Sequence, residues 1–219
     1  MTARPPEGPT TLVVIAKEPV PGRVKTRLTP PCTPAQAARL AEAALADTLR
    51  TLLRVPARRR LLVLAGRTGR WLPPGFDVVP QCDGGLDERI AAAFAHCAGP
   101  TLLVGMDTPQ LTPALLGPAT APPGGWPRRR AWFGPAADGG FWALGMAEPR
   151  PALVRGVPMS TPLTGRAQHR RLTEAGLDVQ ELPVLRDVDS AADAERVAHE
   201  APGGRFAAAW HALGTGVAS

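Results

Sequence analysis

Three short apolar runs in the first half of the chain constrain its fold more than any other feature. They occupy residues 12–15, 61–65 and 101–105, and hydrophobic side chains fill most positions in each. Runs of this length and composition are typical of strands that are buried on both faces, as in a parallel sheet. The segments 34–54 and 85–97 carry apolar residues at helical spacing instead. This alternation predicts an α/β fold with a mostly parallel central sheet flanked by helices.

The second half of the chain is less regular. Residues 118–130 are dense in proline, glycine and arginine and predict an exposed loop. The sequence also predicts strands over 76–79, 131–133, 141–144 and 179–184, and helices over 162–175, 191–201 and 206–213. No internal repeat or long linker divides the chain, so we expect one domain over 10–213 between flexible ends at 1–9 and 214–219.

Composition limits the classes of function. With 219 residues, 44% of them hydrophobic and 20% charged, the chain has the make-up of an ordinary globular protein. Its net charge of +6 comes from arginine, partly in the runs 58–60 and 128–130. We interpret this charge as a solvated surface or as attraction for polyanionic small molecules. Aromatic residues do not interleave with the first run and no recognition motif is present, so nucleic acid is not an expected partner.

The cysteines and the N-terminal residues indicate in which cellular compartment the protein is expected. The three cysteines have no CxxC spacing, which fits a reducing compartment. Residues 1–9 lack the apolar core of a secretory signal, and no run approaches the ~20 apolar residues of a membrane span. We therefore expect a cytoplasmic protein without a membrane partner. Whether the chain forms a homodimer is left open by its sequence.

The only two lysines of the chain lie in one short loop, directly after the first apolar run. This loop, residues 16–28, carries four cations: Lys17, Arg23, Lys25 and Arg27. Open α/β sheets bind ligands at the carboxyl ends of their strands, and a lysine ammonium suits phosphate, so we interpret the loop as a phosphate site. The alternative is a solvated basic turn. Neither the GxxxxGK[ST] nor the GxGxxG phosphate fingerprint is present.

Candidate metal ligands are carboxylates that lie next to other predicted elements. Asp107 comes directly after a buried strand, and the pair Asp187 and Asp189 precedes a predicted helix. Oxygen ligands of this kind, with phosphates and water, are what Mg²⁺ prefers. The alternatives are a turn residue at Asp107 and a helix N-cap at Asp189. The turn 138–140, with two glycines after an aspartate, either approaches a ligand closely or is a plain hairpin turn.

Together these segments resemble the DUF2064 family, or CofC-like transferases, of the GT-A nucleotide-diphosphosugar transferase superfamily. The resemblance spans about residues 11–200 and rests on five segments in order: 16–28, 81–89, 105–109, 134–141 and 187–189. It implies a single Rossmann-like GT-A domain.

The resemblance also implies roles for individual residues. The residues that would bind the nucleotide are Ala16, Lys17, Gly22, Arg23, Lys25, Arg27, Gln81 and Gly85. Asp107 and Asp189 would hold Mg²⁺ or Mn²⁺, and Lys25, Arg23 and Asp107 would act in catalysis. Asp138, Gly139 and Gly140 would line the side of a small-molecule acceptor.

The charge of the first loop bears on the reaction. A triphosphate that loses pyrophosphate needs cations along its β- and γ-phosphates, and four cations exceed what a diphosphate needs. We therefore favour nucleotidyl transfer from a nucleoside triphosphate to a phosphorylated small molecule. Glycosyl transfer from a nucleotide sugar is the alternative, and a non-catalytic nucleotide-binding protein is the second alternative.

Overall fold

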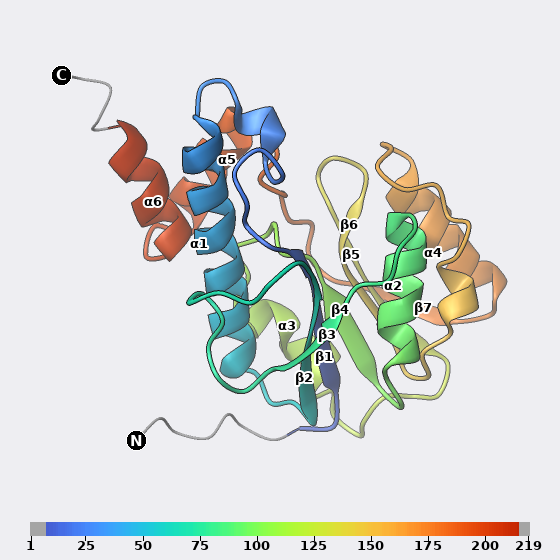
Figure 1. Ribbon diagram of the computed structural model, residues 1–219. Coiled ribbons are helices and arrows are strands. Elements are labelled where there is room, and N and C mark those ends of the chain that lie inside the picture. The colour runs from blue at the N-terminus through green and yellow to red at the C-terminus, as the bar shows by residue number, and fades with distance from the viewer. Residues whose placement is uncertain (1–7, 215–219) are drawn as a thin grey trace.

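A seven-stranded sheet forms the centre of the protein in a computed structural model that describes residues 8–214 (Figure 1). The strand order is β3-β2-β1-β4-β6-β5-β7. The strands are β1 (Thr11–Lys17), β2 (Arg59–Ala65), β3 (Asp77–Pro80), β4 (Thr101–Val104), β5 (Arg130–Pro135), β6 (Phe141–Met146) and β7 (Asp178–Glu181). All neighbours pair in parallel except β6, which is antiparallel to both β4 and β5. The predicted α/β domain with a mostly parallel sheet is thus confirmed.

Within residues 8–214, six α-helices and two short 3-10 helices surround this sheet. They are η1 (Thr26–Leu28), α1 (Pro34–Leu53), α2 (Leu86–Ala95), α3 (Pro113–Thr120), η2 (Pro151–Leu153), α4 (Thr164–Glu174), α5 (Ala191–Glu200) and α6 (Arg205–Gly214). In Figure 1, α1 and α3 lie on one side of the sheet, and α2 and α4 lie on the other. The sheet is therefore the middle of three layers.

The apolar run of β1 is continuous because both of its faces are buried. Leu12 and Val14 belong to the core cluster that includes α1 and α3, whereas Val13 and Ile15 belong to the cluster that includes α2 and α4. Successive side chains of a strand point to opposite faces, so each face needs its own apolar residues. A third cluster joins α1 to α5 and α6 and brings the end of the chain back to the first helix.

Helix α1 begins where the sequence predicts. Thr33 is its N-cap, with Pro34 at the first helical position, and the Thr33 hydroxyl accepts a hydrogen bond from the Gln36 N–H. The Gln36 side chain accepts one from the Thr33 N–H, which completes a capping box. This cap fixes the point at which the chain leaves the basic loop.

Two expectations from the sequence need correction. The exposed loop begins only after Thr120, because α3 occupies 113–120 from a Thr112 N-cap. Arg60 is not part of a solvated surface: it is 7% exposed, and its guanidinium donates to the carbonyl oxygens of Leu52 and Val55. Burial of an arginine is tolerated when such oxygens satisfy its N–H groups.

The expected flexible ends, 1–9 and 214–219, fall outside the described residues except at 8, 9 and 214, and Gly214 is the last residue of α6. Within 8–214 no helix is both long enough and apolar enough to cross a membrane.

The turn at 138–140 packs tightly against the segment before α4. Gly139 has a φ of +88°, and a Cβ placed there would lie 2.1 Å from the carbonyl oxygen of Pro162. A Cβ on Gly165 would lie 2.4 Å from the carbonyl oxygen of Gly140. The Gly165 N–H donates to the Gly139 carbonyl at 2.8 Å. Glycine at both positions lets the two backbones touch, and this contact fixes the turn.

Gly139→Ala should therefore destabilise the fold more than Gly124→Ala. Gly124 has a similar φ of +76°, but a Cβ placed there would have nothing within 4 Å, so it controls for the conformational cost alone. Both substitutions should lower the free energy of unfolding by about 1–2 kcal/mol, because alanine disfavours a left-handed backbone. Gly139→Ala should cost about 1–3 kcal/mol more because backbone atoms must move. Urea unfolding measures the difference, and equal losses would show that the close contact is not rigid.

Candidate functional site

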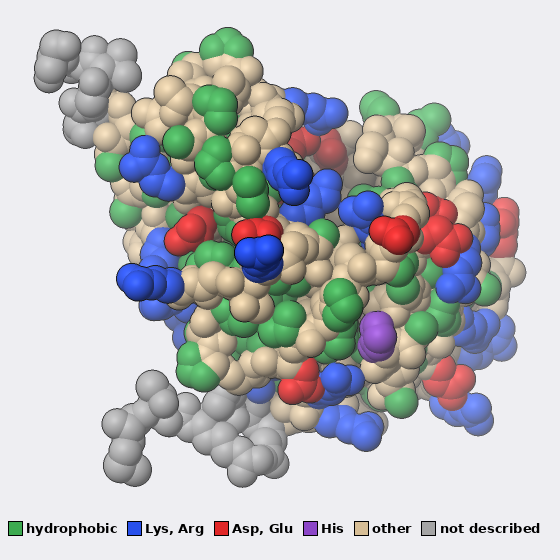
Figure 2. Space-filling view, in the orientation of Figure 1, with side chains coloured by type: hydrophobic (Ala, Val, Ile, Leu, Met, Phe, Trp, Pro, Cys, Tyr) green, Lys and Arg blue, Asp and Glu red, His purple; other side chains and the backbone are tan. Residues whose placement is uncertain are grey.

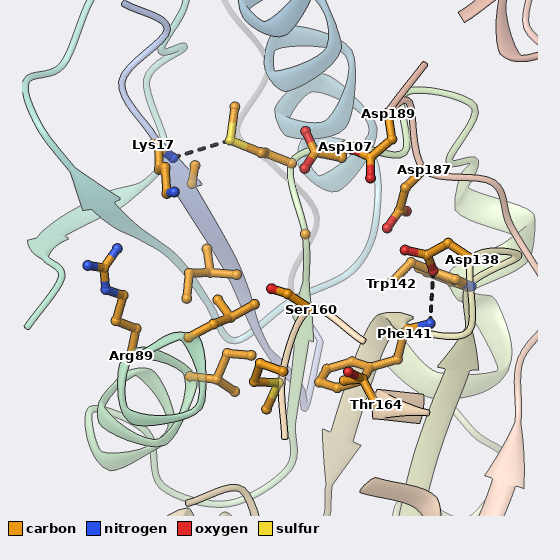
Figure 3. A pocket seen from close by; sticks show the side chains of 18 of the residues that line it. Lys17, Arg89, Asp107, Asp138, Phe141, Trp142, Ser160, Thr164, Asp187 and Asp189 are labelled. Atoms are coloured by element: carbon orange, nitrogen blue, oxygen red, sulfur yellow. Dashed lines mark hydrogen bonds between the residues drawn. The ribbon is translucent and has the colours of Figure 1, made fainter. Parts of the chain in front are cut away.

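A cavity of about 960 Å³ opens where β1 and β4 end. Figure 3 shows its lining, with Lys17 and Arg89 on one side and the aspartates on the other. Ten of the residues predicted from the sequence line it: Ala16, Lys17, Arg23, Lys25, Arg27, Gln81, Asp107, Asp138, Gly140 and Asp189. Three others, Gly22, Gly85 and Gly139, shape the adjoining turns without lining the cavity. The fold thus brings residues from all five resemblance segments to one place.

The basic loop is anchored by its apolar residues. Val24 and Leu28 are buried, and Gly22 turns the chain with a φ of +77°. Lys25 also has a left-handed backbone, with a φ of +49°, directly before η1. Such a backbone is uncommon for a residue other than glycine, and it persists where surrounding contacts fix it. These anchors direct the Lys25 side chain inward.

Lys25 lies between two carboxylates that the sequence separates widely. Its Nζ is 2.6 Å from Asp107 Oδ1 and 3.8 Å from Asp189 Oδ1, and it also donates to the Val188 carbonyl. Its side chain is only 6% exposed. The Val188 N–H donates to the Asp107 carbonyl at 3.0 Å, which holds the two acidic segments together. The two carboxylate oxygens can be no further apart than the sum of their distances to this one nitrogen.

The donor atoms at this point fit a divalent cation. Asp107 and Asp189 offer carboxylate oxygens around a position where a cation, the Lys25 ammonium, already lies. Mg²⁺ takes one or two carboxylates together with waters and substrate phosphates, so two such ligands suffice. No cluster of three or more His, Cys, Asp or Glu ligands is arranged as a metal site within residues 8–214. An ion held by these two carboxylates would need further oxygen ligands, such as those of phosphate or water.

Asp187 is a third carboxylate near this position, and it is partly removed from water. Burial raises its pKa to about 7, and the negative charge of Asp107 contributes to this rise against the opposing effect of Lys25. The neutral form of a carboxyl is favoured where water is excluded and a like charge is close. Asp138 is held differently, since its Oδ1 accepts the Gly140 N–H at 2.8 Å. The sequence indicates Asp187 as one of an acidic pair but not its burial.

The remaining cations of the basic loop are more accessible. Arg27 is 76% exposed and pairs with Asp189 at 3.1 Å. Lys17 and Arg23 are exposed at the cavity, and neither forms an ion pair with any residue of the described chain. Figure 2 shows basic side chains gathered beside the notch at the top of the molecule, with acidic ones within it. An anionic ligand would meet these exposed charges first.

Gln81 is fixed at the neighbouring strand end. Its Nε2 donates to the carbonyl oxygens of Ala16, at 2.7 Å, and Val63, at 3.1 Å. Both amide hydrogens are therefore used between β1 and β2, and the side chain has one orientation. Arg89, which also lines the cavity, donates from Nε to the Gly84 carbonyl at 3.0 Å.

Several lining residues were not assigned a role from the sequence. Arg89 ends the segment 81–89, so its position was indicated without a role. Ser160 and Thr161 lie on the turn before α4, which no motif marks, and Thr164 is the first residue of that helix. No sequence pattern predicts that this turn reaches the cavity, because the contact depends on the packing of Gly139 against it.

Comparison with known proteins identifies the family. The sequence profile of DUF2064, described as an uncharacterized protein conserved in bacteria, matches residues 39–161. The chain belongs to the DUF2064 family. No curated protein sequence matches it. The family match begins after the basic loop, so Lys17 and Lys25 lie outside the matched residues.

Solved structures share the fold of this DUF2064 protein. A provisionally named nucleotide-diphospho-sugar transferase from Desulfovibrio desulfuricans G20 is 26% identical, with a TM-score of 0.74 over 85% of this chain and 84% of its own. Rv0371c of Mycobacterium tuberculosis H37Rv, solved with manganese, is 22% identical, with a TM-score of 0.50 over 87% and 98%. The inositol-1-phosphate CTP transferase of T. maritima is 10% identical, with a TM-score of 0.53 over 85% and 92%. The latter two establish similarity of fold alone.

The raised pKa of Asp187 predicts how stability depends on pH when divalent cations are removed. Its pKa is about 7 in the fold against 3.8 as the ordinary value, so the folded state holds a proton that the unfolded state has lost between these pH values. The free energy of unfolding that this bound proton contributes is fully present below pH 3.8. It falls as the pH rises from there and is lost above about pH 7. Asp187→Asn cannot ionise, so its stability relative to wild type should be greater at pH 8 than at pH 5.

Urea unfolding in EDTA at the two pH values measures this difference. Asp83→Asn is the matched control, because Asp83 is exposed and its substitution should shift stability equally at both. An Asp187→Asn difference that does not change with pH would contradict the burial of this carboxyl.

Proposed function

We propose that this DUF2064 protein transfers a nucleotidyl group from a nucleoside triphosphate to a phosphorylated small molecule, with Mg²⁺ or Mn²⁺. One observation carries the proposal: the exposed cations Lys17 and Arg23 face the same cavity as the carboxylates Asp107 and Asp189. Cations that would bind a polyphosphate thus share one cavity with carboxylates that would hold the accompanying metal. A triphosphate carries enough negative charge to engage the whole basic loop.

In the proposed reaction an anionic oxygen of the acceptor phosphate attacks the α-phosphorus of the triphosphate. A new phosphorus–oxygen bond forms, the bond between the α-phosphorus and the bridging oxygen breaks, and pyrophosphate leaves with the electron pair. No proton must be removed from an acceptor that attacks through such an oxygen. Lys17, Arg23 and Arg27 would hold the β- and γ-phosphates, where negative charge accumulates as pyrophosphate departs.

Asp107 and Asp189 are the residues that would hold the divalent cation. A bound Mg²⁺ or Mn²⁺ would polarise phosphate oxygens and neutralise part of their charge. Lys25 would then direct its ammonium toward the phosphates, since the cation would take over the two carboxylates. The manganese complex of Rv0371c, a protein of similar fold, supports a divalent ion in this role.

Glycosyl transfer from a nucleotide sugar is the second candidate. It is favoured by the provisional name of the D. desulfuricans protein, a nucleotide-diphospho-sugar transferase at 26% identity. The name of the T. maritima protein, a CTP transferase, favours the first candidate on grounds of fold. The two reactions differ in the donor, so donor binding separates them.

Donor preference can be measured before any acceptor is known. With Mn²⁺ present, at least one nucleoside triphosphate should raise the thermal midpoint more than UDP- or GDP-sugars at equal concentration. Stabilisation by a ligand follows RT ln(1 + [L]/Kd), so the tighter ligand gives the larger shift. Pyrophosphate release with a panel of phosphorylated acids then identifies the acceptor. A larger shift with a nucleotide sugar than with every triphosphate would make glycosyl transfer the leading function, and no shift with either would favour a non-catalytic protein.

Lys25→Ala should lower the rate of pyrophosphate release by about 10² or more, because its ammonium faces charge that develops during transfer. Arg58→Ala is the matched control: Arg58 is exposed, belongs to the other basic run and does not line the cavity. The control should keep close to wild-type activity. Equal losses in the two variants would point to a general effect of positive charge and not to a role for the loop.

A further inference from the structure

One wall of the cavity is apolar. It is built by residues of β4, β6, α2 and the segment before α4, and its Phe141 lies away from Asp107 and Asp189 in Figure 3. Its side chains are those of Leu86, Ile90, Leu103, Phe141 and Met159. Leu86 is 43% exposed, so part of its side chain is open to water. Apolar surface that is open to water at a cavity favours contact with an apolar part of a ligand.

The polar parts of a nucleotide have other partners in this cavity. Its phosphates suit the basic loop, and a donor on the edge of a base suits the amide oxygen of Gln81, whose orientation is fixed by the two hydrogen bonds of Nε2. The apolar wall offers neither cations nor amides apart from Arg89 at its edge. It is therefore available to the carbon body of the second substrate.

Ser160 is a polar residue beside this wall with an unusual backbone. Its φ is +58°, in the region that favours glycine. Its hydroxyl makes no hydrogen bond to any other residue of the described chain, and Figure 3 shows it between Arg89 and the aspartates. Serine at a positive φ costs free energy that glycine would not, and such strain gathers at binding sites. This makes the Ser160 hydroxyl a candidate contact for a ligand.

The surrounding turn holds Ser160 in place. The Thr164 hydroxyl donates to the Pro158 carbonyl at 2.9 Å and accepts the Thr161 N–H at 3.1 Å. The contact of Gly139 with Pro162 ties the same turn to the β5–β6 turn. The hydroxyl is thus carried on a fixed support, at the boundary between the apolar wall and the charged end of the cavity.

We propose that the apolar wall and the Ser160 hydroxyl form the subsite for the second substrate, a phosphate monoester whose carbon body is apolar. The ester carbon chain lies on Leu86, Ile90, Phe141 and Met159, and Ser160 donates a hydrogen bond to the phosphate group. This inference rests on the proposed function for the identity of the reaction, but binding of the ester alone tests it separately.

The test uses methyl, ethyl, propyl and butyl phosphate, with glycerol phosphate as the polar counterpart of propyl phosphate. Isothermal titration in Mn²⁺, with and without a nucleoside triphosphate, gives the dissociation constants. Each added methylene that is buried should tighten binding about threefold to fourfold. Propyl phosphate should bind more tightly than glycerol phosphate.

Variants separate the two parts of the subsite. Ser160→Gly and Ser160→Ala should weaken every ester by about tenfold without changing the gain per methylene, because the lost hydrogen bond is to the shared phosphate. Leu86→Ser should reduce the gain per methylene and leave methyl phosphate unchanged. Val184→Ser, which alters a 62% exposed side chain that does not line the cavity, should change neither.

Thermal midpoints of the variants show whether weaker ester binding results from loss of folding. Ser160→Gly relieves the strained backbone, so its midpoint should equal or exceed that of wild type, whereas Ser160→Ala keeps the strain and should not exceed it. Weaker ester binding by a protein that is at least as stable supports a direct contact.

Affinity that does not rise with chain length, or Ser160→Gly binding equal to wild type, would overturn the proposal. Competition between butyl phosphate and the triphosphate would also overturn it, because the wall would then belong to the nucleotide. If the esters bind as expected but no triphosphate binds, the subsite stands and the proposed function fails.

Discussion

The site depends on the contact of the Lys25 ammonium with Asp107, Asp189 and the Val188 carbonyl. This contact joins the first loop to the end of β4 and to the segment before α5. The Lys25 side chain is 6% exposed, so its charge is largely removed from water and is balanced by the carboxylates. Without a cation between them, these carboxylates would repel each other at the edge of the sheet.

The same contact explains how a stable fold can contain a site built from like charges. Asp187 avoids part of the repulsion by holding a proton up to about pH 7, and Lys25 balances its neighbours. A divalent cation with ligand distances near 2.1 Å cannot share the position of an ammonium that is 2.6 Å from Asp107. In the proposed function the ammonium and the metal would compete for one pair of carboxylates, and a released lysine would gain a position near the phosphates.

Local patterns in the sequence predict the fold and the edge at which the cavity lies. The run 12–15 predicts a strand buried on both faces, and the parallel order then places Lys17 and Asp107 at one edge of the sheet. What could not be predicted depends on tertiary contacts. Arg60 belongs to a basic run in the sequence, yet carbonyls from the end of α1 bury it. No sequence pattern indicates the role of Ser160, because its segment is held at the cavity by the tertiary contact of Pro162 with Gly139.

Direct competition for the carboxylates can be tested with Mn²⁺ in the absence of nucleotide. Electron paramagnetic resonance of free Mn²⁺ gives its dissociation constant for wild type, Lys25→Met and Asp107→Asn. Loss of the competing ammonium should make Lys25→Met bind Mn²⁺ more tightly than wild type, and loss of a ligand should make Asp107→Asn bind it more weakly. Weaker binding by Lys25→Met, or unchanged binding by Asp107→Asn, would contradict the assignment of Asp107 and Asp189 to one cation that Lys25 replaces.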